Sequence, residues 1–232
     1  MSTLFASIST NIAAIQAQLP ATVELIAISK GMPAEAVREA YATGVRHFGE
    51  NRIQETEAKL AQLRDLKECV WHFIGHLQTN KVRKALQLFQ YIDSVDSLKL
   101  ARRIDRIAAE LNRTVPICLQ VKLAADPTKY GWEPEELTAA MSELLACKQV
   151  QFRGLMTILP QGLSPQRAIE LFFNLKQLRD QLQAIDPARL SLSTLSMGMS
   201  KDFPLAVKAG ATEVRVGSSN FRHENERESE QE

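Results

Sequence analysis

A lysine ends an apolar segment near the start of the chain. In VELIAISKG, Lys30 follows a mostly apolar run and precedes Gly31 and a helix that begins at Pro33. A lysine at the end of a buried strand is expected to lie partly desolvated, which favours the neutral amine, and a neutral amine can attack an aldehyde. Lys30 is therefore a candidate nucleophile. An ordinary solvated lysine at a strand end would have the same pattern.

Two segments near the C-terminus combine small residues with strand ends. LSMGMSKDFPLAV (195–207) contains Ser196, Gly198 and Ser200, and EVRVGSSNF (213–221) contains Gly217 and Ser218. Small residues with free N–H groups that open helices after the last two strands of a barrel are the usual phosphate site of that fold. Glycine and serine turns occur in any barrel. Together with Lys30, however, these two turns suggest a phosphorylated aldehyde.

Two histidines do not have the spacing of a metal site. His72 and His76 are four residues apart in WHFIGHLQTNK (71–81), but Gly75 and the strand pattern around them argue against one helical face. Histidines with satisfied hydrogen bonds at a strand end are the favoured interpretation, and no metal site is predicted.

Eight short segments, most of them apolar and several β-branched, alternate with amphipathic helical patterns after a leading helix. Such alternation predicts βαβ units with a parallel sheet. An open doubly wound sheet would fit too, but a glycine-rich dinucleotide motif is missing at the first turn. Polar residues just after the strands favour a single α/β (β/α)8 TIM barrel. The expected strands are Val23–Ser29, Arg46–Phe48, Val70–Gly75, Tyr91–Val95, Pro116–Lys122, Gln151–Thr157, Leu192–Ser196 and Glu213–Gly217.

Composition and charge exclude several other classes. The net charge of +1, with both signs interleaved, is not that of a nucleic-acid surface or a polybasic membrane patch. The chain has no run of about 18 apolar residues that would span a membrane. Three widely separated cysteines suggest buried reduced thiols and a cytoplasmic protein. One domain is expected over residues 1–222, with a disordered polar tail at 223–232.

Several motifs together resemble one family. They are AISKG (27–31), FGENR (48–52), WHFIGHLQTNKV (71–82), IDSVDS (92–97), GLMTI (154–158), LSMGMSKDF (195–203) and VRVGSSNF (214–221). The chain resembles the pyridoxal 5′-phosphate (PLP) homeostasis proteins, also known as the proline synthetase co-transcribed homologue type, from about Val23 to Phe221. That family resembles the N-terminal barrel domain of alanine racemase, without the second domain of the racemase.

The resemblance implies a role for each matching residue. Lys30 would hold PLP covalently as a Schiff base, and Arg215 would face the pyridine nitrogen. The remaining expected cofactor-binding residues are Ser196 or Ser200 with Gly217 and Ser218 at the phosphate, Met197 and Gly198 shaping that loop, Asn51 near the phenolic oxygen, and His72 in the mouth. The chain departs from the family pattern at Lys122, where asparagine is common, at Asp126, where glutamate is usual, and at Arg222, which replaces a glycine.

The resemblance implies a PLP carrier or regulator in vitamin B6 homeostasis and in amino-acid and keto-acid balance, without strong catalysis. An arginine at the pyridine nitrogen opposes its protonation and so weakens the electron sink. None of the three tyrosines, Tyr41, Tyr91 and Tyr130, has motif support as a second base. A monomer is expected, with PLP-dependent apo-enzymes as candidate partners. The alternatives are a weak amino-acid racemase, a phosphosugar enzyme that forms an imine at Lys30, and an interaction protein that hands cofactor over by contact.

Overall fold

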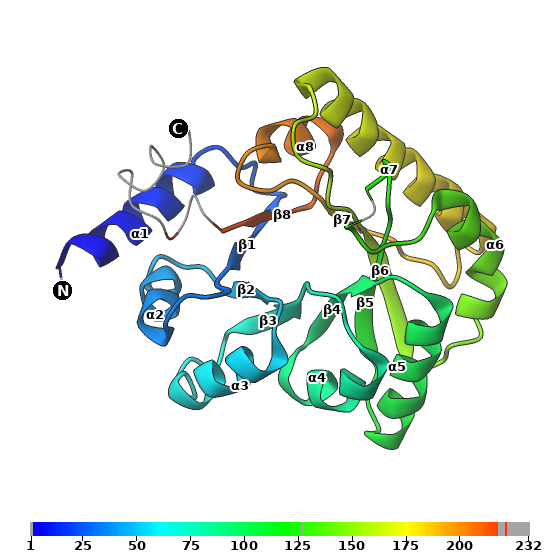
Figure 1. Cartoon of the computed structure of the whole chain (residues 1–232), viewed down its shortest axis with the longest axis horizontal. Helices are drawn as coiled ribbons and strands as arrows, with labels where there is room; N and C mark the ends of the chain where they lie inside the picture. Colours follow the sequence, from blue (N-terminus) through cyan, green and yellow to red (C-terminus); the bar gives the residue numbers. More distant parts are fainter. Residues whose placement is uncertain (1, 127, 218–220, 222–232) are drawn as a thin grey trace.

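The computed structural model describes residues 2–126, 128–217 and 221, with side chains from residue 8 onwards. Within this part of the chain, eight strands close into a barrel in the order of the sequence, and β8 pairs with β1 in parallel (Figure 1). This confirms the predicted (β/α)8 barrel. The strands are β1 Glu24–Ile28, β2 His47–Glu50, β3 Val70–Phe73, β4 Tyr91–Val95, β5 Val115–Gln120, β6 Val150–Met156, β7 Thr194–Ser196 and β8 Glu213–Val216.

Helices surround the barrel, and two of them begin at serine caps. The hydroxyl of Ser97 accepts a hydrogen bond from the Leu100 N–H, and that of Ser164 accepts one from the Arg167 N–H, with Pro165 at the first helical position. The helices are α1 Ser2–Gln16, α2 Ala34–Ala42, α3 Ile53–Gln62, α4 Val82–Leu88, α5 Leu98–Glu110, α6 Pro134–Leu144, α7 Pro165–Ile185 and α8 Phe203–Ala209, with a short 3-10 turn η1 at Thr79–Lys81.

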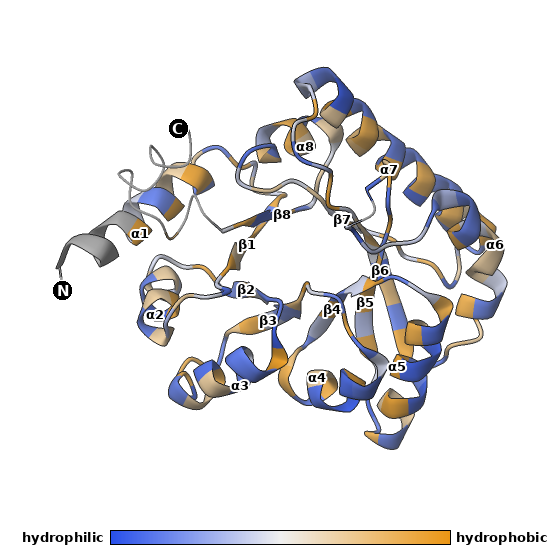
Figure 2. Cartoon of the chain, in the orientation of Figure 1, coloured by the Kyte–Doolittle hydropathy of each residue, from blue (hydrophilic) through white to orange (hydrophobic). Residues whose placement is uncertain are grey.

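The core lies between the strands and the inner faces of these helices. Helices α5 and α7 alternate hydrophobic and hydrophilic residues along their length (Figure 2). In α7, Phe172, Leu175, Leu178 and Leu182 are buried, whereas Ile169, at the same helical spacing, is only partly buried. The helical period of the apolar residues therefore marks the buried face of α7, except at its edge.

The three cysteines are buried and unpaired, as predicted. Burial raises the pKa of each thiol, to about 11 for Cys69, which makes them unreactive at neutral pH. Among the described residues, no helix has both the length and the apolar character needed to cross a membrane. Residues 222–232 lie outside the described part, so the disordered tail stays a prediction.

Candidate functional site

Lys30 lies just beyond the carboxyl end of β1, in the mouth of the barrel. Its side chain is exposed, and it has no hydrogen-bond partner among the described residues. The expectation that the strand end would partly desolvate this amine is therefore wrong for the protein alone. The amine is instead accessible to a molecule that enters the mouth.

A buried ion pair, missed in the sequence, fixes the residue before Lys30. Lys59 of α3 pairs with Glu50 at the end of β2, and both side chains are almost completely buried. Lys59 Nζ also donates to the Ser29 carbonyl oxygen at 2.7 Å, and the Ser29 hydroxyl donates to the Glu50 carboxylate at 2.7 Å. The pair thus ties β1, β2 and α3 together directly behind Lys30. Its signal in the sequence is the spacing of Lys59, which comes three residues after Thr56 and six after Ile53, the other buried residues of α3.

Arg215 of β8 is held rigidly across the barrel from several sides. Its Nη1 donates to the Ser196 hydroxyl at 2.8 Å, and its Nη2 donates to the Thr157 carbonyl oxygen at 2.6 Å. Burial lowers the pKa of Arg215, while the carboxylates of Asp93 and Glu213 oppose that shift. A buried guanidinium with these fixed partners is a permanent, immobile positive charge.

The loop after β7 packs closely against α8. Met197 is buried, and Gly198 has a φ of +90°; a Cβ there would lie 2.6 Å from the Ala206 Cβ. Both the backbone conformation and the close packing therefore require glycine at this position. The Ser200 hydroxyl accepts a hydrogen bond from the Gly217 N–H at 3.3 Å, which joins the loops after β7 and β8.

The structure thus brings together six of the predicted residues: Ser196, Met197, Gly198, Ser200, Arg215 and Gly217. Ser218 lies outside the described residues, so its predicted role is not addressed. Asn51 directly follows β2 at the same end of the barrel as Lys30, and its backbone packs against Gly75, where a Cβ would lie 2.5 Å from the Asn51 carbonyl oxygen.

His72 lies elsewhere than predicted. Its Nδ1 is 2.6 Å from Asp93 Oδ2, its Nε2 is 2.9 Å from His47 Nδ1, and its ring stacks on Tyr91. His47 and Tyr91 are the first residues of β2 and β4, so the His72 side chain belongs to a network toward the amino-terminal end of the barrel. The WHFIGHLQTNKV motif places His72 on a strand, but neither the motif nor the alternation of side chains along that strand predicts which residues the His72 ring contacts.

The same network contains a cluster of possible metal ligands. His72, Asp93 and Glu213 offer donor atoms within 4.8 Å of one another. Both ring nitrogens of His72 already have partners, however, and Arg153 donates to the Glu213 carboxylate at 2.8 Å. Arg153 and Arg215 also act electrostatically on Asp93. These contacts give the two carboxylates arginine counter-charges and argue against a cation at this cluster.

His47 gives this network a dependence on pH. Burial, with the neighbouring His72 and Arg153, lowers the pKa of His47 to about 4 from its usual 6.5. Between these values the unfolded chain binds a proton that the folded chain does not, so stability falls as the pH drops through this window. We expect a loss of about 2 kcal/mol, after allowance for partial exposure of the ring.

Urea unfolding of the wild type and of His47→Gln, at pH 6.5 and at pH 4, measures this effect. The variant should lose less stability than the wild type over this interval. Because Asp93 and Glu213 titrate in both proteins, the difference between the two isolates His47. Equal losses in the two proteins would contradict the assignment.

The loop after β5 is closed by contacts that involve one of the unusual residues. Lys122 Nζ lies 2.7 Å from the Glu133 carboxylate, so the lysine at the usual asparagine position has an ion-pair partner of its own. Val121 forms a β-bridge with Trp132, whose Nε1 donates to the Val95 carbonyl oxygen at 3.0 Å. The Asp126 carboxylate accepts hydrogen bonds from Thr128. Lys122 and Asp126, where the chain departs from the family pattern, therefore each have a partner among the described residues of this loop.

Comparisons with known proteins identify the relatives of this chain. The family model described as "Alanine racemase, N-terminal domain" matches residues 5–224. A pyridoxal phosphate homeostasis protein of Synechocystis is 45% identical over 207 residues, which cover 89% of this chain and 94% of that protein. One of Pseudomonas aeruginosa is 43% identical over 202 residues, covering 87% of this chain and 85% of that protein.

Solved structures show the same fold. The structure of PipY of Synechococcus elongatus with PLP bound has a TM-score of 0.89 and 51% identity, and covers 93% of this chain and 100% of that one. An alanine racemase of Clostridium difficile has a TM-score of 0.77 at 16% identity, covering 94% of this chain but 57% of the racemase. At that low identity, the second similarity supports the barrel fold alone.

Proposed function

Because the chain belongs to the alanine racemase N-terminal domain family and, within it, to the pyridoxal phosphate homeostasis proteins, we propose that it holds PLP as a Schiff base on Lys30 and acts in PLP homeostasis. One observation carries the covalent assignment. Lys30 is an exposed amine without a partner among the described residues, and it lies in the mouth of the barrel. An accessible amine of this kind can condense with an aldehyde.

The residues around the mouth suit the other parts of PLP. The hydrogen bond from the Gly217 N–H to the Ser200 hydroxyl brings a backbone N–H and a hydroxyl together at the mouth, where a bound phosphate would replace the hydroxyl as the acceptor of that N–H. When bound, PLP supplies the aldehyde and an electron-withdrawing ring. Ser196 and Thr157 hold the guanidinium of Arg215 in place. Arg215 would therefore keep a fixed position toward the pyridine nitrogen of bound PLP. Its charge would oppose protonation of that nitrogen.

This arrangement favours a carrier or regulator over a strong catalyst. Tyr41 bonds to Glu68 on the outer side of the barrel, and Tyr91 lies between His72 and Arg153. Tyr130, in the loop after β5, stacks on His76 of the loop after β3. Tyr41 and Tyr91 are therefore not placed as a base facing Lys30, and the ring of Tyr130 is held against His76. Racemisation of an amino acid by the wild type, lost in Lys30→Ala, would contradict the carrier assignment.

Two further parts of the proposal concern the cellular compartment of the protein and the apo-enzymes that would receive PLP from it. The three buried thiols support a reducing compartment such as the cytoplasm. The exposed position of Lys30 would let a monomer release PLP to apo-enzymes. Transfer rates measured with several recipient apo-enzymes distinguish handover by contact from release into solvent, because only handover by contact depends on the recipient.

The first experiment is an absorbance spectrum of the protein with added PLP, before and after borohydride. We expect a yellow band that borohydride removes, with a stable adduct on the peptide that contains Lys30. A protein that stays colourless with added PLP would overturn the cofactor assignment. If borohydride instead gave such a colourless protein a stable adduct with a phosphorylated sugar, a phosphosugar enzyme that forms an imine at Lys30 would be favoured.

A further inference from the structure

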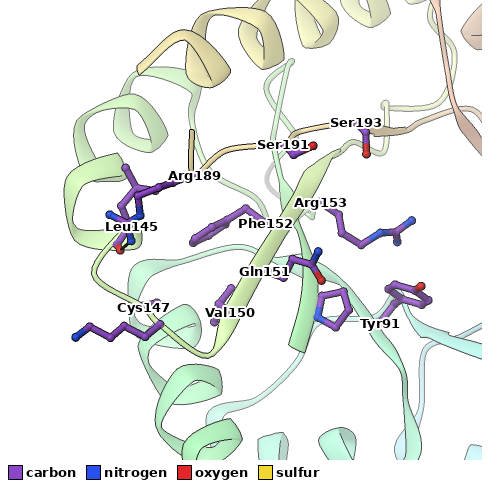
Figure 3. A pocket seen from close by; sticks show the side chains of 12 residues that line it. Tyr91, Leu145, Cys147, Val150, Gln151, Phe152, Arg153, Arg189, Ser191 and Ser193 are labelled. Carbon is purple, nitrogen blue, oxygen red and sulfur yellow. Dashed lines mark hydrogen bonds between the residues drawn. The ribbon is translucent and has the colours of Figure 1, made fainter. Parts of the chain in front are cut away.

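A cavity of about 580 Å³ opens at the end of the barrel opposite to Lys30. It is formed by the amino-terminal parts of β4, β5 and β6 with the loops before β6 and β7 (Figure 3). Small-molecule sites commonly have volumes of about 300–1,000 Å³. The cavity is therefore large enough for a ligand, and the length of the barrel separates it from the proposed PLP site.

The lining of this cavity is basic on one side and apolar on the other. Its described lining residues include Lys148, Arg153 and Arg189 but no aspartate or glutamate. Val150 and Phe152 contribute apolar surface. A cleft lined by charges of one sign concentrates ligands of the opposite sign. The lining thus favours an anion that carries an apolar group.

Arg153 contributes a donor that the protein does not use. Its guanidinium lies 4.2 Å from the centre of the Tyr91 ring, and its Nη2 donates to Glu213. Its Nη1 is buried and has no hydrogen-bond partner among the described residues. A buried donor without a partner is costly. Arg153 lines the cavity with a side chain that is 21% exposed, so an oxyanion that reaches this guanidinium from the cavity would supply the missing acceptor. The side chain extends from β6 toward Tyr91 (Figure 3).

Arg189 is the second cation of the cavity, and it is anchored at the rim. Its Nη2 donates to the Leu145 carbonyl oxygen, which ties the loop before β7 to the end of α6. The side chain is exposed, so it can be replaced without disturbing the core. Figure 3 shows Arg189 beside Leu145, on the opposite side of Phe152 from Arg153.

We propose that this cavity binds a small organic oxyanion, a carboxylate or a phosphate monoester on an apolar body, with Arg153 and Arg189 as its cationic partners. The proposal does not depend on PLP binding, because none of the lining residues belongs to the mouth.

Isothermal titration calorimetry with benzoate and with phenyl phosphate tests the proposal. The protein is first loaded with PLP and reduced with borohydride, so that the mouth is blocked; if PLP does not load, the benzoate titration is run on the untreated protein. We expect one site with a Kd of about 1 mM or tighter for at least one probe. Binding of benzoate alone identifies a carboxylate site, and binding of phenyl phosphate alone identifies a phosphate site.

Arg189→Gln should weaken this binding by about fivefold, as loss of an exposed charge predicts. The matched control is Arg167→Gln, since Arg167 is an exposed arginine of α7 that pairs with Glu170 outside the cavity. The control should bind as the wild type does. The proposal is overturned if neither probe binds saturably, or if the two variants bind equally well.

Discussion

Replacing Lys30 with alanine should abolish the borohydride-stable PLP adduct while the fold stays intact. The side chain is exposed and has no hydrogen-bond partner among the described residues, so its loss should change the free energy of unfolding by no more than about 0.5 kcal/mol. The loss of the adduct should be complete, because a Schiff base requires a primary amine. Intact-mass spectrometry after borohydride measures the adduct, and urea unfolding measures the stability.

The matched control is Lys201→Ala, which removes an exposed lysine from the loop after β7. This variant should keep both the yellow band and the adduct. An adduct that persists in Lys30→Ala would refute the assignment of Lys30 but would leave PLP binding itself in place. The two parts of the proposal therefore have separate tests.

The overall barrel could be predicted from the sequence because its signals are local. Apolar strands, helical periods and caps such as Ser97 and Ser164 each depend on a few neighbouring residues. All eight predicted strands are present, with ends that differ by a few residues. Gly198 was also identified from its motif, and the structure gives the reason, since a Cβ would collide with α8.

Side-chain contacts between residues far apart in the sequence could not be predicted in the same way. His72 was expected in the mouth, but its partners His47 and Asp93 come from the neighbouring strands β2 and β4. Which side chains meet inside a barrel depends on strand stagger, and no local pattern records that stagger. The Lys59–Glu50 pair was missed for a related reason, because charged residues are expected on exposed surfaces.

Lys59→Met should lower the free energy of unfolding by about 3–5 kcal/mol, because it leaves the buried Glu50 carboxylate without its counter-charge. The loss should be much smaller in the double variant Glu50→Gln, Lys59→Met. There the buried charge is gone, and the glutamine can still accept a hydrogen bond from Ser29. Urea unfolding of the wild type, both single variants and the double variant gives the coupling energy of the pair.

The surface pair of Lys84 and Glu57 is the matched control, since both of its side chains are about half exposed. Lys84→Met should cost no more than about 1 kcal/mol, because solvent screens exposed ion pairs. Equal losses in Lys59→Met and Lys84→Met would mean that burial does not strengthen the inner pair. In Lys59→Met, Ser29 also loses the donor to its carbonyl oxygen. The Lys59→Met variant should then bind PLP more weakly than the wild type, since Lys30 follows Ser29 directly.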